Sequence, residues 1–270
     1  MSVALPAPST PVGARALQAL LAQPSRALVA LDYDGTLAPV VDRPEDAVAA
    51  PGAGEVVARL AGLVGQVALV SGRPAGHVVE LGGFADVPRL VVLGQYGAER
   101  WSGGQLTADQ PLPGTALVRA QLPALVAAEG AELEDKGLSL VVHTRRAKDP
   151  GGALVRLYAP VAALAARAGL ELHAGRLVLE LRPPGHDKGR ALRRLTRDRS
   201  AVLFAGDDVG DLAAFDAVDR LRADGTPGLL VCSDSDEGPA ELRARADLVV
   251  DGPSGVVQLL RELAEALGPG

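Results

Sequence analysis

Short apolar runs of four or five residues recur in the N-terminal part of the chain, and each stops abruptly at polar or glycine residues. They occupy residues 28–31, 66–70 and 90–93. Runs of this length without alternation are typical of strands that are buried on both faces of a parallel sheet. The apolar spacing of residues 54–64 and 75–81 instead predicts helices between these strands. Strands and helices in this order indicate an α/β fold with a parallel sheet.

The rhythm changes in the middle of the chain, where residues 105–183 predict an inserted module. Residues 115–128 and 151–168 have helical patterns, and each is followed by two strand-like runs that meet at Gly137 or Gly175. Helix, hairpin, helix, hairpin is an α+β arrangement and does not continue the parallel sheet. We therefore expect this module to be a separate domain.

The parallel rhythm then resumes and completes the first domain. Its remaining predicted strands and its closing helix are residues 201–205, 228–232, 247–250 and 254–267. The predicted core domain therefore comprises residues 1–104 and 184–270. Within it, residues 1–12 are expected to form a loose tail, and residues 38–53, which contain three prolines, are expected to form a loop near the end of the first strand.

Composition narrows the possible functions. With 270 residues, of which 48% are hydrophobic and only 3% aromatic, the chain can bury a large core made mostly of Ala, Val and Leu. A net charge of −6 argues against nucleic acid or an anionic membrane as the main partner. The single cysteine, Cys232, excludes an internal disulfide framework and a cysteine-based zinc site.

The expected location of the chain is the cytoplasm. The N-terminus has neither the basic segment nor the uninterrupted apolar segment of a signal peptide. No apolar stretch reaches the length of a membrane span. We therefore expect a monomer that acts on a small molecule and not on nucleic acid or a membrane.

Two acidic residues, Asp32 and Asp34, follow the first predicted strand. In open parallel sheets, ligands bind beyond the carboxyl ends of the strands, which is where both acids lie. On an extended chain, residues two apart point to the same side. Two carboxylates held so close repel each other unless a cation or a shared proton compensates the charge. For this segment alone, an acidic turn that ends a strand is also compatible with the pattern.

Three further segments place polar side chains at predicted strand ends or helix starts. Ser71 follows the second strand at a helix start, where backbone amides bind anions. Lys188 adds a positive charge at another helix start. A second acidic cluster, formed by Asp207, Asp208 and Asp211, follows a later strand. Each segment alone also suits a helix cap, a solvated surface or a loop, but their order and their common position at element ends together indicate a shared site.

Together these residues describe a site for phosphoryl transfer. Carboxylates suit Mg²⁺, a hard cation that binds one or two of them together with waters and phosphate oxygens. A carboxylate can attack phosphorus and form an aspartyl-phosphate. A second carboxylate two residues away can protonate the leaving oxygen. Ser71 and Lys188 would hold the other phosphoryl oxygens.

These motifs resemble those of the haloacid dehalogenase superfamily. That superfamily carries Asp-x-Asp-Gly-Thr, a Ser or Thr after the second strand, a Lys, and Gly-Asp-Asp-x-x-x-Asp or a close relative. The corresponding segments are residues 32–36, Ser71, Lys188 and residues 206–211. The resemblance spans residues 28–251, and it implies a Rossmann-like core and an Mg²⁺-dependent phosphatase.

The resemblance also implies a role for each of the acidic residues. Asp32 would be the nucleophile, and Asp34 would be the general acid and then the general base. Mg²⁺ would be bound by Asp32, by the backbone carbonyl of Asp34 and by Asp207. Asp208 and Asp211 would support the site through waters and the charge of the neighbouring lysine.

Four further stretches resemble the trehalose-6-phosphate phosphatase family: residues 31–39, residues 71–74, residues 134–139 with 143–145, and residues 179–183 leading to 187–189. The insert also lies where the superfamily has a type C2 cap, which chooses the substrate by closing over the site. The resemblance therefore implies hydrolysis of trehalose 6-phosphate to trehalose and phosphate.

The candidates for binding this sugar phosphate are Arg73, Lys136, Glu180 and His143. The family contacts the sugar with a Lys and a Glu of the cap, and Lys136 and Glu180 match their positions. Charged side chains suit a polyol, because a site built to pair hydroxyls rejects ligands that leave its polar groups unpaired. On spacing alone, Lys136 and Glu180 also fit solvent-facing hairpin positions, and His143 fits a packed apolar strand. One residue departs from the family: Tyr96 stands where a His is often found.

Three other functions are compatible with parts of this pattern. Another C2-capped phosphatase would act on sucrose 6-phosphate or mannosyl-3-phosphoglycerate. A non-enzymatic phospho-acceptor switch also combines a strand-end Asp, a hydroxyl residue and a Lys, but it needs neither the acid Asp34 nor a large cap. A mutase of the superfamily would carry a helical cap, whereas helices and hairpins are expected here.

Overall fold

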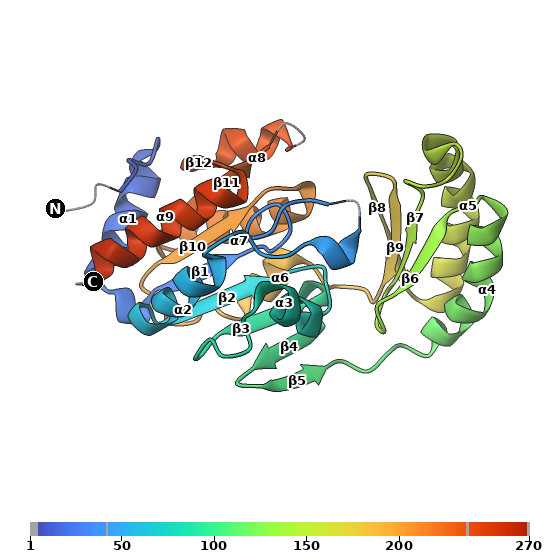
Figure 1. Cartoon of the computed structure of the whole chain (residues 1–270), viewed down its shortest axis with the longest axis horizontal. Helices are drawn as coiled ribbons and strands as arrows, with labels where there is room; N and C mark the ends of the chain where they lie inside the picture. Colours follow the sequence, from blue (N-terminus) through green and yellow to red (C-terminus); the bar gives the residue numbers. More distant parts are fainter. Residues whose placement is uncertain (1–4, 42, 236–237, 269–270) are drawn as a thin grey trace. The chain divides into compact units, whose positions relative to one another are not determined.

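The computed structural model describes residues 5–41, 43–235 and 238–268 of a chain that divides into two compact units. One unit comprises Met1–Thr107 and Asp187–Gly270, and the other comprises Ala108–His186. The two units appear in Figure 1 as a larger α/β assembly and a smaller α+β assembly.

The larger unit contains an eight-stranded sheet in the order β12-β11-β10-β1-β2-β3-β4-β5. Neighbouring strands from β12 to β3 pair in parallel, and β4 pairs antiparallel with β3. The parallel α/β core is therefore confirmed. The strands are β1 (Leu28–Leu31), β2 (Gln66–Val70), β3 (Val91–Gly94), β4 (Glu99–Ser102), β5 (Gln105–Ala108), β10 (Val202–Gly206), β11 (Gly228–Asp234) and β12 (Leu248–Asp251).

Helices connect these strands and pack on the sheet. They are α1 (Pro11–Ala22), α2 (Ala53–Leu63), α3 (Ala75–Gly82), α6 (Lys188–Arg193), α7 (Leu212–Ala223), α8 (Ala240–Arg245) and α9 (Gly252–Leu267). Short 3₁₀ turns occur at η1 (Pro24–Arg26), η2 (Pro44–Asp46), η3 (Gln95–Gly97) and η4 (Val209–Asp211). None of the helices in the described part of the chain has the length and apolar character that crossing a bilayer requires.

The central strand β1 is buried on both faces, which is why its sequence is apolar throughout. Val29 and Leu31 pack on one face, in a core that also contains side chains of α1, α2, α3 and α9. Leu28 and Ala30 pack on the other face, with side chains of α6, α7 and α8. Helices therefore cover both faces of the sheet (Figure 1).

Strands β4 and β5 extend the sheet beyond β3, and the apolar pattern does not predict them. In β4 the buried residues Glu99 and Trp101 alternate with more exposed ones, but four residues are too few for a reliable period-two signal. Two glycines, Gly103 and Gly104, connect the strands with φ angles of 57° and 79°. Because all of β5 but its last residue stays with the larger unit, the smaller unit starts at Ala108, a few residues later than expected.

The N-terminal segment is anchored, so the expectation of a loose tail is wrong for its second half. The Thr10 hydroxyl donates a hydrogen bond to the Asp247 carboxylate and caps α1 by accepting one from the backbone of its first turn. The backbone N–H and the hydroxyl of Ser9 both donate to the Asp247 carbonyl, at 2.7 and 3.0 Å. Residues 1–4 of the expected tail lie outside the described residues.

The smaller unit is an antiparallel sheet in the order β6-β7-β9-β8, with two helices packed on one face, in agreement with the α+β pattern. Its elements are α4 (Gly114–Ala128), β6 (Glu132–Asp135), β7 (Leu140–His143), α5 (Pro150–Ala168), β8 (Glu171–Gly175) and β9 (Val178–Arg182). Val142 and Leu179 share a core with Leu122 and Leu164 of the helices. Because side chains alternate along β9, Glu180 lies on the opposite face of this sheet.

Substitution of a glycine can test how closely α6 packs. Gly189 is the second residue of α6, and Gly76 is the second residue of α3. A β-carbon on Gly189 would overlap the carbonyl oxygen of Ala213, whereas one on Gly76 would have no neighbour within 4 Å. We expect Gly189→Ala to lower the free energy of unfolding by about 1–3 kcal/mol because a backbone shift is required. Gly76→Ala, the matched control in α3, should be neutral or stabilising by up to about 1 kcal/mol. Urea unfolding measures both, and equal stabilities of the two variants would contradict this close approach.

Candidate active site

The carboxyl ends of three neighbouring strands bring together residues that are far apart in the sequence. Asp32 follows β1, Ser71 follows β2 and Asp207 follows β10. β1 lies between the other two strands, and Leu31 is in register with Leu69 of β2 and with Ala205 of β10. The three polar side chains therefore meet at one edge of the sheet, where ligands bind in such folds, and each is buried.

Lys188, the first residue of α6, is buried among the aspartates. Its Nζ lies 2.8 Å from Oδ1 of Asp32, 2.8 Å from Oδ1 of Asp211 and 3.7 Å from Oδ1 of Asp208. Burial alone would lower the pKa of Lys188, but the carboxylates of Asp211, Asp32 and Asp208 raise it well above its usual value. The ammonium group is therefore charged and holds the cluster together.

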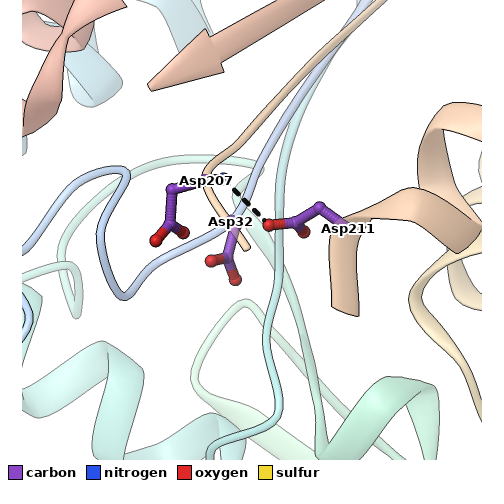
Figure 2. A group of neighbouring side chains, drawn as sticks. All are labelled: Asp32, Asp207 and Asp211. Carbon is purple, nitrogen blue, oxygen red and sulfur yellow. Dashed lines mark hydrogen bonds between the residues drawn. The ribbon is translucent and has the colours of Figure 1, made fainter. Parts of the chain in front are cut away.

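Asp211 organises the loop after β10. Its Oδ1 accepts the hydrogen bond from Lys188, and its Oδ2 accepts from the backbone N–H groups of Asp207 (3.0 Å) and Asp208 (3.2 Å). Figure 2 shows Asp211 beside Asp32 and Asp207, with its bond to the Asp207 backbone dashed. Both oxygens of this fully buried carboxylate thus have partners, whereas the Asp208 side chain is mostly exposed.

The acidic cluster has the composition of a divalent cation site. Oxygens of Asp32, Asp207 and Asp211 all lie within 4.8 Å of one another. Oδ1 of Asp207 is buried and, among the described residues, has no hydrogen-bond partner. An unpartnered buried carboxylate oxygen beside two further carboxylates suits a hard cation with oxygen ligands. The residues present therefore fit Mg²⁺, and Asp207 is better placed to bind it than Asp211, whose oxygens are engaged.

The pKa values in the cluster reflect this excess of negative charge. The pKa of Asp207 is raised from 3.8 to about 8: burial makes the largest contribution and the charges of Asp211 and Asp208 add to it, while Lys188 and a hydrogen bond with Asp32 act in the opposite direction. Burial also raises the pKa of Asp32 and of Asp211 well above the usual range, against the effect of Lys188. One ammonium group therefore compensates only part of the charge of three carboxylates, and a proton or a second cation must compensate the rest.

Between Asp32 and Asp34, Tyr33 is buried, and its hydroxyl donates to the Ala47 carbonyl (2.8 Å). Asp34 is near enough to Asp32 for its charge to contribute to the raised pKa of Asp32. The carboxylate of Asp34, half-exposed, accepts two hydrogen bonds from Arg73: Nε to Oδ2 and Nη2 to Oδ1, both 2.7 Å. Such a two-point pair fixes the carboxylate geometrically. Arg73, predicted to bind substrate, is thus engaged with Asp34.

Arg73 also joins this acid to the proline-containing loop. Its Nη1 donates to the carbonyl oxygen of Pro44 at 2.7 Å. Pro44 belongs to the expected loop 38–53, of which residue 42 lies outside the described residues. The backbone N–H of Arg73 donates to the Ser71 hydroxyl oxygen at 3.1 Å, so one residue links the predicted acid, the loop and the predicted phosphate-binding serine.

In the smaller unit, the structure brings Lys136 and Glu180 together. Lys136 Nζ lies 3.5 Å from Oε1 of Glu180, and the Ser139 hydroxyl donates to the same oxygen at 3.2 Å. Nε2 of His143 lies 2.9 Å from Oε2 of Glu134 on the same sheet. All lie on strands or turns of the sheet, and His143 is not part of the helix-covered core.

Several buried polar residues around the site have no role that the sequence predicts. Glu99 accepts from the backbone N–H of Ala75 (2.7 Å), at the start of the helix after Ser71. Ser233 donates to the carbonyl of Gly35 (2.6 Å), which has a φ of 72° and packs against the Asp207 carboxylate. The four residues of β4 are too few for their alternation to place Glu99 inside from the sequence, and the Ser233 contact spans 198 residues and has no local signal.

These features define the class of the protein. A parallel sheet whose central strand ends in two aspartates, with a buried lysine and a second aspartate cluster beside them, is the arrangement of the haloacid dehalogenase hydrolases. The chain belongs to the trehalose-phosphatase family within that class, because the family model described as trehalose-phosphatase matches residues 30–247.

Curated relatives agree with this assignment. The trehalose-6-phosphate phosphatase of Escherichia coli is 32% identical over 198 residues, which is 70% of this chain and 73% of that protein. The trehalose-phosphate phosphatase of Mycobacterium avium is 32% identical and is matched over 63% of its length. A Mycobacterium tuberculosis protein described as an uncharacterized glycosyl hydrolase is 33% identical over 88% of this chain, which spans only 18% of that protein.

Solved structures share the fold. The C-terminal domain of trehalose-6-phosphate phosphatase from Candida albicans superposes with a TM-score of 0.76 at 19% identity, covering 97% of this chain and 99% of that one. A trehalose-6-phosphate phosphatase related protein gives a TM-score of 0.73 at 24% identity, covering 88% of this chain and 97% of that one. At these identities, the similarity establishes the fold alone.

The raised pKa of Asp207 predicts how stability depends on pH. Between its ordinary value of 3.8 and about 8, the folded chain binds more protons than the unfolded chain. The free energy of unfolding should therefore fall as pH rises through this window, by roughly 1 kcal/mol per pH unit for one such group. We expect the melting temperature in EDTA to fall between pH 6 and pH 8. Added Mg²⁺ should reduce this fall because bound cation stabilises the folded state.

Asp207→Asn is the control for this pH dependence. It removes the titrating carboxyl, so its melting temperature in EDTA should change less with pH than that of the wild-type protein. Thermal unfolding at several pH values measures the difference between the two proteins. Identical slopes would show that Asp207 is ionised at neutral pH without a cation.

Proposed function

We propose that this chain hydrolyses trehalose 6-phosphate to trehalose and phosphate with the help of Mg²⁺. The observation that supports it most strongly is the buried group of Asp32, Asp207, Asp211 and Lys188 in a chain of the trehalose-phosphatase family. The named activities of the relatives supply the substrate of this proposal. The cytoplasmic location and the monomeric state stay predictions.

In the proposed mechanism, Asp32 is the nucleophile. Its carboxylate oxygen attacks phosphorus, the bond from phosphorus to the sugar oxygen breaks, and an aspartyl-phosphate forms. Asp34 gives its proton to the leaving sugar oxygen. A water molecule then attacks the aspartyl-phosphate, Asp34 takes up a proton from it, and phosphate leaves with Asp32 restored.

The other residues support charge and orientation. Ser71 and Lys188 would bind the non-bridging phosphoryl oxygens, and Lys188 also compensates the charge of Asp32. Asp32, the carbonyl of Asp34 and Asp207 would bind Mg²⁺, which stabilises charge on the transferred group when it is bound. Asp211 holds Lys188 and the loop of Asp207 in place.

Arg73 has a second proposed role beyond the predicted one. Its two-point contact with Asp34 fixes the carboxylate that transfers the proton, and such orientation contributes to rate when the bound geometry is productive. We propose that it positions this acid. Its predicted contact with substrate stays a prediction.

For the sugar, we propose Lys136 and Glu180 of the inserted unit, which would act as a cap. These residues hydrogen-bond each other and Ser139, so they form one polar group on their sheet. A paired ammonium and carboxylate can donate to and accept from adjacent sugar hydroxyls. His143, paired with Glu134, stays a further candidate for substrate binding.

The catalytic assignment predicts different effects for the two leading acids. Asp32→Asn should abolish turnover because the nucleophile is lost. Asp34→Asn should slow the release of phosphate from trehalose 6-phosphate by about 10²–10⁴-fold, the usual contribution of general acid catalysis. Asp34→Asn should slow the hydrolysis of p-nitrophenyl phosphate less, because the p-nitrophenolate leaving group needs no proton. The variant should still bind Mg²⁺, because the proposed ligand is the backbone carbonyl of residue 34.

Phosphate release measures these variants, and Asp198→Asn is a surface control that should behave like the wild type. Wild-type turnover by Asp32→Asn would refute the nucleophile. Equal losses of kcat/KM by Asp34→Asn on both substrates would refute the role of Asp34 as the acid for the sugar oxygen, because kcat/KM reports the steps up to formation of the aspartyl-phosphate and not its hydrolysis.

The substrate assignment predicts that kcat/KM is higher for trehalose 6-phosphate than for sucrose 6-phosphate or mannosyl-3-phosphoglycerate. Lys136→Ala and Glu180→Ala should lower kcat/KM for trehalose 6-phosphate at least tenfold more than for p-nitrophenyl phosphate. The sugar hydroxyls lose their partners in these variants, and unpaired polar groups of this kind cost about tenfold or more, whereas p-nitrophenyl phosphate has no sugar hydroxyls. A steady-state assay of each variant with both substrates measures this ratio.

The matched control is Arg146→Ala, which breaks an exposed ion pair with Glu132 in the same unit. This variant should leave kcat/KM unchanged for both trehalose 6-phosphate and p-nitrophenyl phosphate. Faster turnover of sucrose 6-phosphate or mannosyl-3-phosphoglycerate by the wild-type chain would contradict the substrate and leave the phosphoryl chemistry intact. Equal losses on both substrates would mean that Lys136 and Glu180 do not contact sugar.

A further inference from the structure

The turn after β3, η3, carries unusual backbone conformations. Gln95, Tyr96 and Gly97 all have positive φ angles, of 45°, 57° and 91°. Glycine adopts such angles freely, but a residue with a bulky side chain does so at a cost of about 1–3 kcal/mol. Strain of this kind persists only where the surrounding structure holds it, and it concentrates at functional sites.

The turn is held on one side by the loop that contains Ser71. The backbone N–H of Tyr96 donates to the Ser71 carbonyl at 3.0 Å, and the N–H of Gln95 donates to the Arg73 carbonyl at 2.8 Å. These two bonds flank Gly72. The backbone of the strained turn therefore fixes the loop on either side of this glycine.

The side chain of Tyr96 covers Gly72 itself. A β-carbon built on Gly72 would lie 2.7 Å from the tyrosine hydroxyl oxygen and 2.8 Å from its ring carbon Cζ. Real β-carbons are not found at such distances, so the phenol end of the ring rests on the glycine backbone. Gly72 directly follows the buried Ser71, where backbone amides and the hydroxyl would bind phosphoryl oxygens.

A buried network behind the turn keeps it in this conformation. Nε2 of Gln95 donates to Oε1 of Glu99 at 2.6 Å, and Oε2 of Glu99 accepts from the backbone N–H of Ala75 at 2.7 Å. Gln95 and Glu99 are both buried. Hydrogen bonds between buried polar groups are costly to break, which explains how the fold maintains the strain.

The other end of the turn contacts the helix of the buried lysine. The carbonyl of Gly97 accepts from Nη1 of Arg194 at 2.8 Å, and a β-carbon on Gly97 would lie 2.9 Å from that of Ala191. Both partners lie in or directly after α6, which begins at Lys188. One strained turn thus touches the serine loop and the lysine helix, the two elements expected to bind the non-bridging phosphoryl oxygens.

We propose that Tyr96 is a positioning residue of the phosphoryl-binding site. Its ring, laid on Gly72 by the left-handed backbone, fixes where the Ser71 hydroxyl and the Gly72 N–H meet a phosphate. This inference rests on the proposed phosphoryl chemistry at that site but not on the identity of the sugar.

Calorimetric binding of inorganic phosphate in the presence of Mg²⁺ tests the proposal without any sugar. Tyr96→Gly removes both the ring and the strain, so it should weaken phosphate binding about tenfold or more, since displacements of about 1 Å at such sites have effects of this size. Its melting temperature should fall little, because relief of the left-handed strain offsets the lost ring contacts. Tyr96→Phe keeps the ring and should bind phosphate nearly as the wild type does.

The matched control is Asp198→Gly, which relieves a left-handed residue (φ 58°) on the surface away from the site. It should leave phosphate binding unchanged. Gly72→Ala should weaken binding in the wild-type background but have little further effect beside Tyr96→Gly, because the two groups act through one contact.

Three results would overturn the proposal: unchanged phosphate affinity in Tyr96→Gly, additive losses in the double variant, or no phosphate binding by the wild-type protein. Failure of the proposed function differs from these results. A wild-type chain that binds phosphate but does not hydrolyse trehalose 6-phosphate would refute the sugar substrate, and it would leave the effect of Tyr96 measurable.

Discussion

A single buried ammonium group among three buried carboxylates is the interaction on which the site depends. Lys188 lies 2.8 Å from oxygens of both Asp32 and Asp211, and Asp207 is beside them with an oxygen that has no partner among the described residues. Charges removed from water must be paired or the groups change protonation. The folded chain therefore requires a proton or a divalent cation at this place, and the same requirement favours a substrate that brings phosphoryl oxygens to a bound cation.

The fold places these charged groups together by packing segments that are far apart in the sequence. Parallel pairing of β1 with β10 sets Asp32 beside Asp207, and the Gly35 turn lies so near the Asp207 carboxylate that a β-carbon there would overlap it. α6 approaches α7 closely at Gly189, the residue after Lys188. Close backbone packing at Gly35 and Gly189 thus sets where the charged groups lie. A side chain at either glycine would push these segments apart.

The sequence predicts the parts of this structure that have a strong local pattern. Strands buried on both faces are apolar throughout, so β1 was predictable together with the acids that follow it. The pattern does not predict β4, because four alternating residues carry too little signal. It predicts a tail at Thr10, because the partner Asp247 is 237 residues away. Likewise, Arg73 could be predicted to lie at the site, but its pairing with Asp34 depends on tertiary geometry.

The central claim is that a cation takes the place of a proton at the buried aspartates. Titration of the protein with Mg²⁺ near pH 7, in two buffers of different ionisation enthalpy, tests it most directly, because the difference between the binding enthalpies gives the protons released. With the pKa of Asp207 at about 8, the account predicts release of about one proton for each ion bound, and much less in Asp207→Asn. Mg²⁺ binding without proton release, or with equal release in that variant, would contradict it.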